Sequence, residues 1–98
     1  MFSAREIIAA FNAHMQQSGV RNSGWYVGVT SNIRGRLFGD HRVSEQNGYW
    51  IWRRAHNDTV ARSAEAAYHR AGCQGSGGGG DHTAVYVYAY VVTPTTVE

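Results

Sequence analysis

Lysine is absent from this chain of 98 residues, so arginine supplies all 9 of its strongly basic side chains. The planar guanidinium group can bind a phosphate through two parallel hydrogen bonds and can stack on nucleobases. A biased base composition of the coding sequence would produce the same preference for arginine. Because the formal net charge is only +2, charge alone does not predict nucleic-acid binding, which would require the arginines to gather on one face.

Cysteine and long apolar runs are also scarce. The single cysteine, Cys73, excludes a disulfide within the chain and fits a reducing compartment. The chain has no run of about 18 apolar residues, the length that a membrane-spanning helix needs. Its first residues lack the basic and apolar regions of a secretory signal. We therefore expect a cytoplasmic protein that has no membrane partner.

The length and the hydrophobic content of 43% predict one domain with a modest core. At the start, Ser3 and Glu6 form a capping-box pattern, and apolar residues follow at helical spacing up to Gly19. A second helix is expected after Thr30 or Ser31, either of which can cap it, and its end near Gly39 is poorly defined. A third helix is expected from Asp58 or Thr59 to residue 72.

Aromatic and β-branched residues predict three strands, at residues 25–30, 49–54 and 83–92. The element order is therefore α-β-α-β-α-β. We expect an α/β (α+β) fold with a small, mainly antiparallel three-stranded sheet flanked by helices. Gly28, inside the first strand, indicates a close backbone approach or a bulge. Residues 75–80 are almost all glycine, which is typical of a flexible connector, and glycines alone are a weak phosphate-binding signal.

The central part of the chain resembles the GIY-YIG nuclease family. The resemblance lies in Tyr26-Val27-Gly28 with Thr30, in Arg36-Leu37 on the following helix, in Ala61 and Glu65 four residues apart on the next helix, and in a glycine-rich stretch followed by the Val85–Tyr90 strand. It covers about residues 24–92. It implies a single GIY-YIG-like domain over residues 1–98, with residues 3–18 as a helical extension.

The resemblance implies a divalent-metal-dependent endonuclease that cleaves nucleic-acid phosphodiesters, and we expect DNA rather than RNA as its partner. Glu65 would hold a single Mg²⁺ or Mn²⁺ ion, and Arg36 would stabilise charge on the phosphate. Tyr26 would orient the attacking water, and His41 would assist. This chemistry agrees with the needs of phosphodiester hydrolysis and with the few protein ligands that Mg²⁺ takes. Target selection would depend on a homo-oligomer or on a partner protein.

The chain departs from the family where the leading G-I-Y strand should stand, because a helix precedes Gly24. The tyrosine of that strand is therefore missing from its usual place. The strand near the other end of the chain could fill the gap, with Tyr86, Tyr88 or Tyr90 supplying the hydroxyl; we take Tyr88 as the candidate. These tyrosines share one face of their strand, so they could equally serve only to cover the sheet.

A second departure concerns the histidine. The family places it four residues after the arginine, whereas His41 follows Arg36 by five. Four positions share a face of an α-helix and five do not. Either the helix breaks at Gly39 and lets the imidazole swing inward, or the position is lost.

Each candidate also has a purely structural interpretation. Tyr26 could be a half-buried strand residue, Arg36 could pair with Asp40, and Glu65 could lie on a helix surface. A zinc site built on His69 and Cys73 with His41 or His56 has little support, because the spacing lacks paired ligands. The alternative function is a catalytically degenerate module of the same fold that binds nucleic acid or a protein partner.

Overall fold

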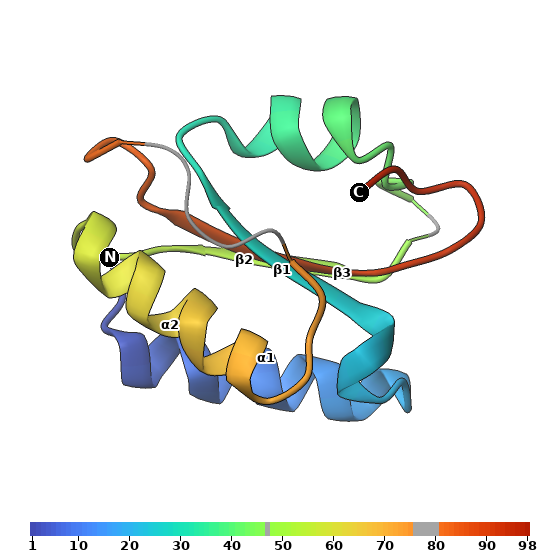
Figure 1. Cartoon of the computed structure of the whole chain (residues 1–98), viewed down its shortest axis with the longest axis horizontal. Helices are drawn as coiled ribbons and strands as arrows, with labels where there is room; N and C mark the ends of the chain where they lie inside the picture. Colours follow the sequence, from blue (N-terminus) through green and yellow to red (C-terminus); the bar gives the residue numbers. More distant parts are fainter. Residues whose placement is uncertain (47, 76–80) are drawn as a thin grey trace.

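The computed structural model describes residues 1–46, 48–75 and 81–98, and it has the expected α+β architecture. One antiparallel sheet contains β1 (Trp25–Thr30), β2 (Trp50–Arg54) and β3 (Tyr86–Val91) in the order β1-β3-β2. The strand that is last in the chain is therefore central in the sheet. The helices are α1 (Ala4–Ser18), the 3-10 turn η1 (Asn22–Gly24), the π-helical η2 (Gly35–Asp40) and α2 (Asp58–Arg70) (Figure 1).

The first helix has the predicted ends. The Ser3 side chain accepts a hydrogen bond from the Glu6 backbone, and the Glu6 carboxylate accepts one from the Ser3 backbone. At the other end, Gly19 adopts the left-handed conformation with φ 72°, which glycine takes at little cost. Ile7, Phe11 and Met15 are buried, so the amphipathic pattern gives the face that packs on the sheet.

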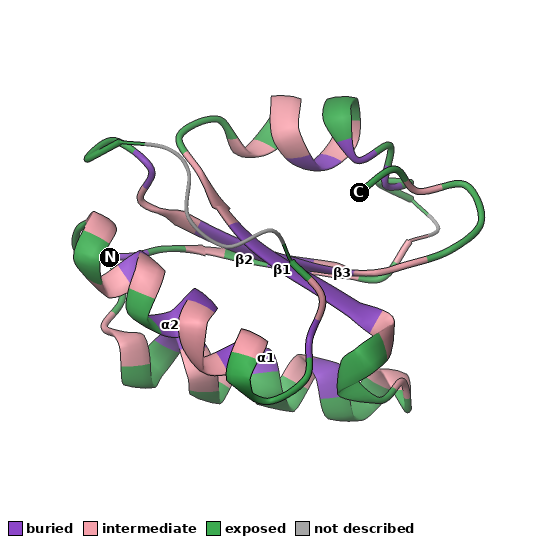
Figure 2. Cartoon of the chain, in the orientation of Figure 1, coloured by how far each residue is buried: buried purple, intermediate pink, exposed green. Residues whose placement is uncertain are grey.

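Helices α1 and α2 cover one face of the sheet, and η2 crosses the opposite face (Figure 1). The face under α1 and α2 is apolar, and we call it the helix face. Its strand residues include Val27, Ile51, Val87 and Ala89, all of them buried. In Figure 2 the buried segments lie along the middle of the sheet and on the inner sides of both helices. Alternation along each strand thus sends every second side chain into this core.

The opposite face, which we call the tyrosine face, carries three cross-strand rows. Written in the order β1, β3, β2, the rows are Tyr26, Tyr90 and Trp50; Gly28, Tyr88 and Trp52; and Thr30, Tyr86 and Arg54. The η2 segment packs over the first row: Leu37 joins the Tyr26, Tyr88 and Tyr90 cluster, and Phe38 meets Trp50 edge-on at 5.1 Å. The third row lies beyond this cover.

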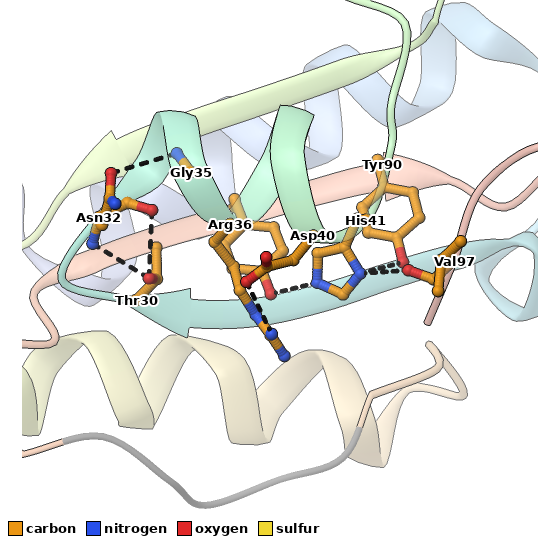
Figure 3. Close-up of polar contacts among 9 residues, drawn as sticks. Thr30, Asn32, Gly35, Arg36, Asp40, His41, Tyr90 and Val97 are labelled. Carbon is orange, nitrogen blue, oxygen red and sulfur yellow. Dashed lines mark hydrogen bonds and ion pairs between the residues drawn. The ribbon is translucent and has the colours of Figure 1, made fainter.

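Some expected boundaries shift. The third strand begins at Tyr86 rather than residue 83, because Asp81 and Thr83 form a turn in which the Asp81 carboxylate accepts from the Thr83 backbone. The expected cap at Thr30 or Ser31 is wrong: the Asn32 side chain accepts from the Gly35 backbone at 3.1 Å. Thr30 instead supports the turn by accepting from the Asn32 backbone (Figure 3).

Residues 76–80 of the expected glycine-rich connector lie outside the described residues. Just before them, Gln74 pairs with the outer edge of β1, donating to the Trp25 carbonyl and accepting from the Val27 amide. In the described part of the chain, every helix is too short or too polar to cross a membrane.

Candidate active site

The candidate site begins at Gly28, where β1 has no side chain on the tyrosine face. A Cβ atom built at Gly28 would lie 2.5 Å from the Tyr88 hydroxyl oxygen and 2.7 Å from its ring carbon Cζ. The Tyr88 ring therefore occupies the space that any other residue at position 28 would fill. The close approach expected from the sequence is confirmed, and the continuous pairing of Gly28 with Tyr88 shows that β1 has no bulge there.

His41 reaches the same place through a widened helical turn. In η2 the His41 backbone N–H donates to the Arg36 carbonyl, five residues earlier, at 2.9 Å. A π-helical turn holds more residues than an α-helical one, so positions five apart come onto one side. The expected choice between a broken helix and a lost position is therefore resolved differently: the helix widens, and His41 is buried with 1% of its surface exposed.

Three hydrogen bonds hold the imidazole (Figure 3). Nδ1 lies 2.6 Å from the Val97 carbonyl oxygen and 2.8 Å from the Tyr90 hydroxyl, and Nε2 lies 2.7 Å from the Tyr88 hydroxyl. A carbonyl oxygen can only accept, so the proton of a neutral imidazole is on Nδ1. Nε2 is then an acceptor, and the Tyr88 hydroxyl must donate to it.

The environment keeps this imidazole neutral. Burial lowers the pKa of His41, the hydrogen bond to the Val97 carbonyl opposes that effect, and the positive charge of Arg36 lowers the pKa further. Burial likewise raises the pKa of Tyr88 to about 12, although Arg36 acts in the opposite direction. At neutral pH the pair therefore consists of a neutral histidine that accepts and a protonated tyrosine that donates.

Arg36 lies beside the tyrosine at the end of this chain of contacts. A polar contact with the Tyr88 hydroxyl is the largest influence that raises the pKa of Arg36, ahead of its pairing with Asp40. The Arg36–Asp40 pair itself is 3.3 Å long, and the Arg36 side chain is 39% exposed. The structural interpretation of Arg36 is therefore confirmed by its pair with Asp40, and the exposed part of its side chain leaves surface for a ligand.

Tyr26 completes the aromatic cluster. Its ring stacks on Tyr90 at 5.2 Å and lies 4.7 Å from the His41 ring, measured between centroids. Tyr88 is also stacked with Tyr26, at 6.3 Å. The structure therefore brings together Tyr26, Arg36, His41 and Tyr88, four of the five residues that the sequence singled out.

Glu65, the fifth candidate, comes from α2 on the other side of β1. It is 5% exposed, so it is not a surface helix residue. Burial raises the pKa of its carboxyl group, and the positive charges of His69 and Arg62 oppose this effect. Its own negative charge contributes to the raised pKa of Tyr88, so the two groups are within electrostatic reach.

The described residues hold no group of three or more histidine, cysteine, aspartate or glutamate side chains arranged to bind a metal. The zinc arrangement considered above gains nothing from the structure, because His69 Nε2 donates to the Val27 carbonyl at 2.8 Å and burial raises the pKa of Cys73. Glu65 is a single carboxylate, within the one or two that Mg²⁺ takes while it keeps most of its waters, and only 5% of its surface is exposed.

Two features of the site have no signal in the sequence. Val97 contributes only main-chain atoms: its carbonyl accepts from His41 Nδ1, and its N–H donates to the His41 carbonyl at 2.8 Å. Tyr90 was one of three equivalent tyrosines in the alternating pattern. Its hydroxyl contacts Nδ1 rather than Nε2 because it lies one row further along β3 than Tyr88.

Comparisons of this chain with protein-family models, with curated proteins and with solved structures found no match. The case for a function therefore rests on the residues and their geometry.

Proposed function

We propose that this domain is a GIY-YIG-like endonuclease that hydrolyses nucleic-acid phosphodiesters at the cluster of Tyr26, Arg36, His41 and Tyr88, with Glu65 on α2 as its metal ligand. The observation that carries the proposal is the relay from Arg36 through the Tyr88 hydroxyl to His41 Nε2, with the 2.7 Å hydrogen bond at its centre. β3 would then take the role of the missing first strand, and Tyr88 would supply its tyrosine.

The fixed tautomer defines the direction of proton transfer. A water molecule beside the Tyr88 hydroxyl gives up a proton to that oxygen as the water oxygen bonds to phosphorus, while the bond from phosphorus to the leaving sugar oxygen breaks. Tyr88 passes its own proton to His41 Nε2, which has a free lone pair because Nδ1 donates to Val97. Because the pKa of Tyr88 is about 12, this relay starts from the protonated tyrosine rather than from a tyrosinate.

The other residues handle charge. Arg36 faces the developing negative charge on the phosphate oxygens, where a guanidinium group is most effective because it can donate two hydrogen bonds. Tyr26 packs against the His41 ring at 4.7 Å and holds the relay in place. Glu65 would bind Mg²⁺ or Mn²⁺, which when bound neutralises phosphate charge and polarises the scissile bond.

The test is cleavage of supercoiled DNA by the purified protein with Mg²⁺ or Mn²⁺. Glu65→Gln and Tyr88→Phe should each lower the rate at least about 100-fold, the scale for losing one preorganised stabilising group. Two matched controls should cleave normally: Glu45→Gln removes an exposed carboxylate that pairs with Arg34, and Tyr49→Phe removes the hydroxyl of a tyrosine that is 56% exposed.

Equal cleavage by Glu65→Gln and the native protein would assign the activity to a contaminant or to another site. Absence of cleavage, together with DNA binding that weakens steeply with salt, would favour the degenerate binding module. A homo-oligomer or a partner protein would direct the domain to its target. Light scattering in the same buffer first measures whether the domain forms a homo-oligomer.

A further inference from the structure

The tyrosine face is open where Trp52 of the second row meets Tyr86 and Arg54 of the third row, unlike the first row. Trp52 is 38% exposed, Tyr86 is half-buried and Arg54 is exposed. Trp52 meets Tyr86 edge-on at 5.7 Å, and the Arg54 guanidinium lies over the Tyr86 ring at 5.9 Å. We call these three residues the aromatic platform. Because Arg54 covers Tyr86, the Trp52 indole is the open aromatic surface of the three.

The platform is continuous with the candidate active site. Trp52 and Tyr88 are directly paired across β2 and β3, and Arg54 and Tyr86 form the next pair on the same face. Neighbouring strands lie about 4.8 Å apart, and the Tyr88 hydroxyl reaches over Gly28 on β1, so Trp52 on β2 lies across β3 from the contact of Tyr88 with Arg36. Any long ligand held at that contact can extend over the platform.

The chemistry of the platform matches an unpaired nucleotide. Exposed aromatic rings on an open sheet stack nucleobases, and a neighbouring arginine contacts phosphate or stacks in turn. The interior bases of a duplex present no free face to an indole on a protein surface. The base pairs of a duplex are already stacked on one another, so a base that reaches Trp52 must leave the stack.

We propose that Trp52, with Tyr86 and Arg54, stacks an unpaired nucleobase of the strand whose phosphate is held by Arg36. This inference rests on the proposed function for the position of that phosphate. It adds a substrate class: nucleic acid that is single-stranded or locally unpaired beside the cleaved bond. The expected order of preference is single strand or flap over an intact duplex.

Binding is measured separately from cleavage, in the Glu65→Gln background, with fluorescein-labelled oligothymidylate and a duplex of equal length. The single strand should bind more tightly than the duplex and should quench tryptophan fluorescence. Trp52→Ala should weaken binding about tenfold, the scale for losing one base stack. Tyr49→Ala is the matched control, because Tyr49 is a 56% exposed aromatic residue next to β2 with opposite strand parity to Trp52.

A second variant covers the case in which Trp52→Ala does not fold. Trp52→Phe keeps an aromatic surface, so its affinity, measured by anisotropy, should remain within a few-fold of the parent while the quenching disappears. Trp25 and Trp50 remain in this variant, and quenching that persists would overturn the proposal. Arg54→Gln should reduce the salt dependence of binding by about one phosphate contact.

The proposal would also be overturned if Trp52→Ala and Tyr49→Ala weakened oligonucleotide binding equally. It would likewise be overturned if the duplex bound as tightly as the single strand, or if neither bound. The plasmid-cleavage assay tests the proposed nuclease activity independently of all these binding results. Oligouridylate measured beside oligodeoxyuridylate presents the same base on the two sugars: equal affinities mean that only the base is recognised, and a difference identifies the sugar.

Discussion

The helix face and the tyrosine face belong to the same three strands, yet their chemistry is opposite. On β3, Val87 and Ala89 bury only carbon against α1 and α2, whereas Tyr88 and Tyr90 bury hydroxyl groups against an imidazole. Both sets are almost completely withdrawn from water. The comparison shows that alternation along one strand can place an apolar core on one face of the sheet and a hydrogen-bonded cluster on the opposite face.

Gly28→Ala should break the tyrosine face most severely. The added Cβ would collide with the Tyr88 ring and hydroxyl, which cannot move without losing the contact to His41. We expect cleavage to fall at least about 100-fold and stability to fall by about 2 kcal/mol, as overpacking does. Thermal unfolding and the plasmid assay measure the two effects.

Gly39→Ala is the matched control, since a Cβ at Gly39 meets nothing within 4 Å. Similar losses in both variants would show that glycine flexibility, rather than the contact with Tyr88, explains the effect.

Val87→Ala and Tyr88→Phe should separate the two faces. Val87 is fully buried in the helix-face core, so its truncation should cost about 2 kcal/mol of stability through lost contacts and a cavity, while the folded fraction cleaves normally. Tyr88→Phe should cost about 1 kcal/mol for the lost hydrogen bond and nearly all activity. Denaturant titration and cleavage rates at low temperature check this crossing pattern; a loss of both properties in both variants contradicts it.

Val97→Pro should lower the rate of cleavage about tenfold. Proline lacks the N–H that donates to the His41 carbonyl, so the Val97 carbonyl should lose its fixed position at Nδ1. That hydrogen bond raises the pKa of His41, so its loss should lower the pKa further and move the acid limb of the cleavage profile to lower pH. Val97→Ala keeps both main-chain bonds and should behave as the native protein; identical pH profiles for the two variants would refute the role of the carbonyl.

The smallest effect is a gain in stability from Glu65→Gln, of about 1 kcal/mol at neutral pH. Burial raises the pKa of Glu65 above its ordinary 4.5, so the folded state holds this proton more tightly than the unfolded state. The charged carboxylate therefore costs stability as pH rises past 4.5. The gain should vanish below pH 4.5, which thermal unfolding at several pH values tests; a gain independent of pH would point to packing instead.

Much of the fold was predictable because local patterns agree with tertiary packing. The capping box at Ser3, the alternation from Tyr86 to Tyr90 and the glycine at position 28 each have one simple structural solution. The antiparallel α+β sheet and the element order follow from them. The cap at Asn32 was missed because Thr30, Ser31 and Asn32 are all capable of capping, and only the geometry of the turn selects among them.

The sequence predicted which residues come together in the candidate site, but it did not predict the hydrogen bonds among them. Tyr26, Arg36, His41 and Tyr88 come together as the sequence suggested, but which tyrosine reaches Nε2 depends on the register of β1 with β3. The Val97 contact uses backbone atoms that every residue carries, so no sequence pattern could indicate it. Strand register and main-chain contacts therefore cannot be derived from a single sequence.

The widened turn of η2 has a consequence for how contacts are inferred from sequence spacing. The His41 N–H donates to the Arg36 carbonyl five residues earlier, so the wider turn brings to one side two residues that an α-helix would place on different faces. The interval between two residues in a sequence therefore depends on the width of the turn that joins them as well as on the contact that they make.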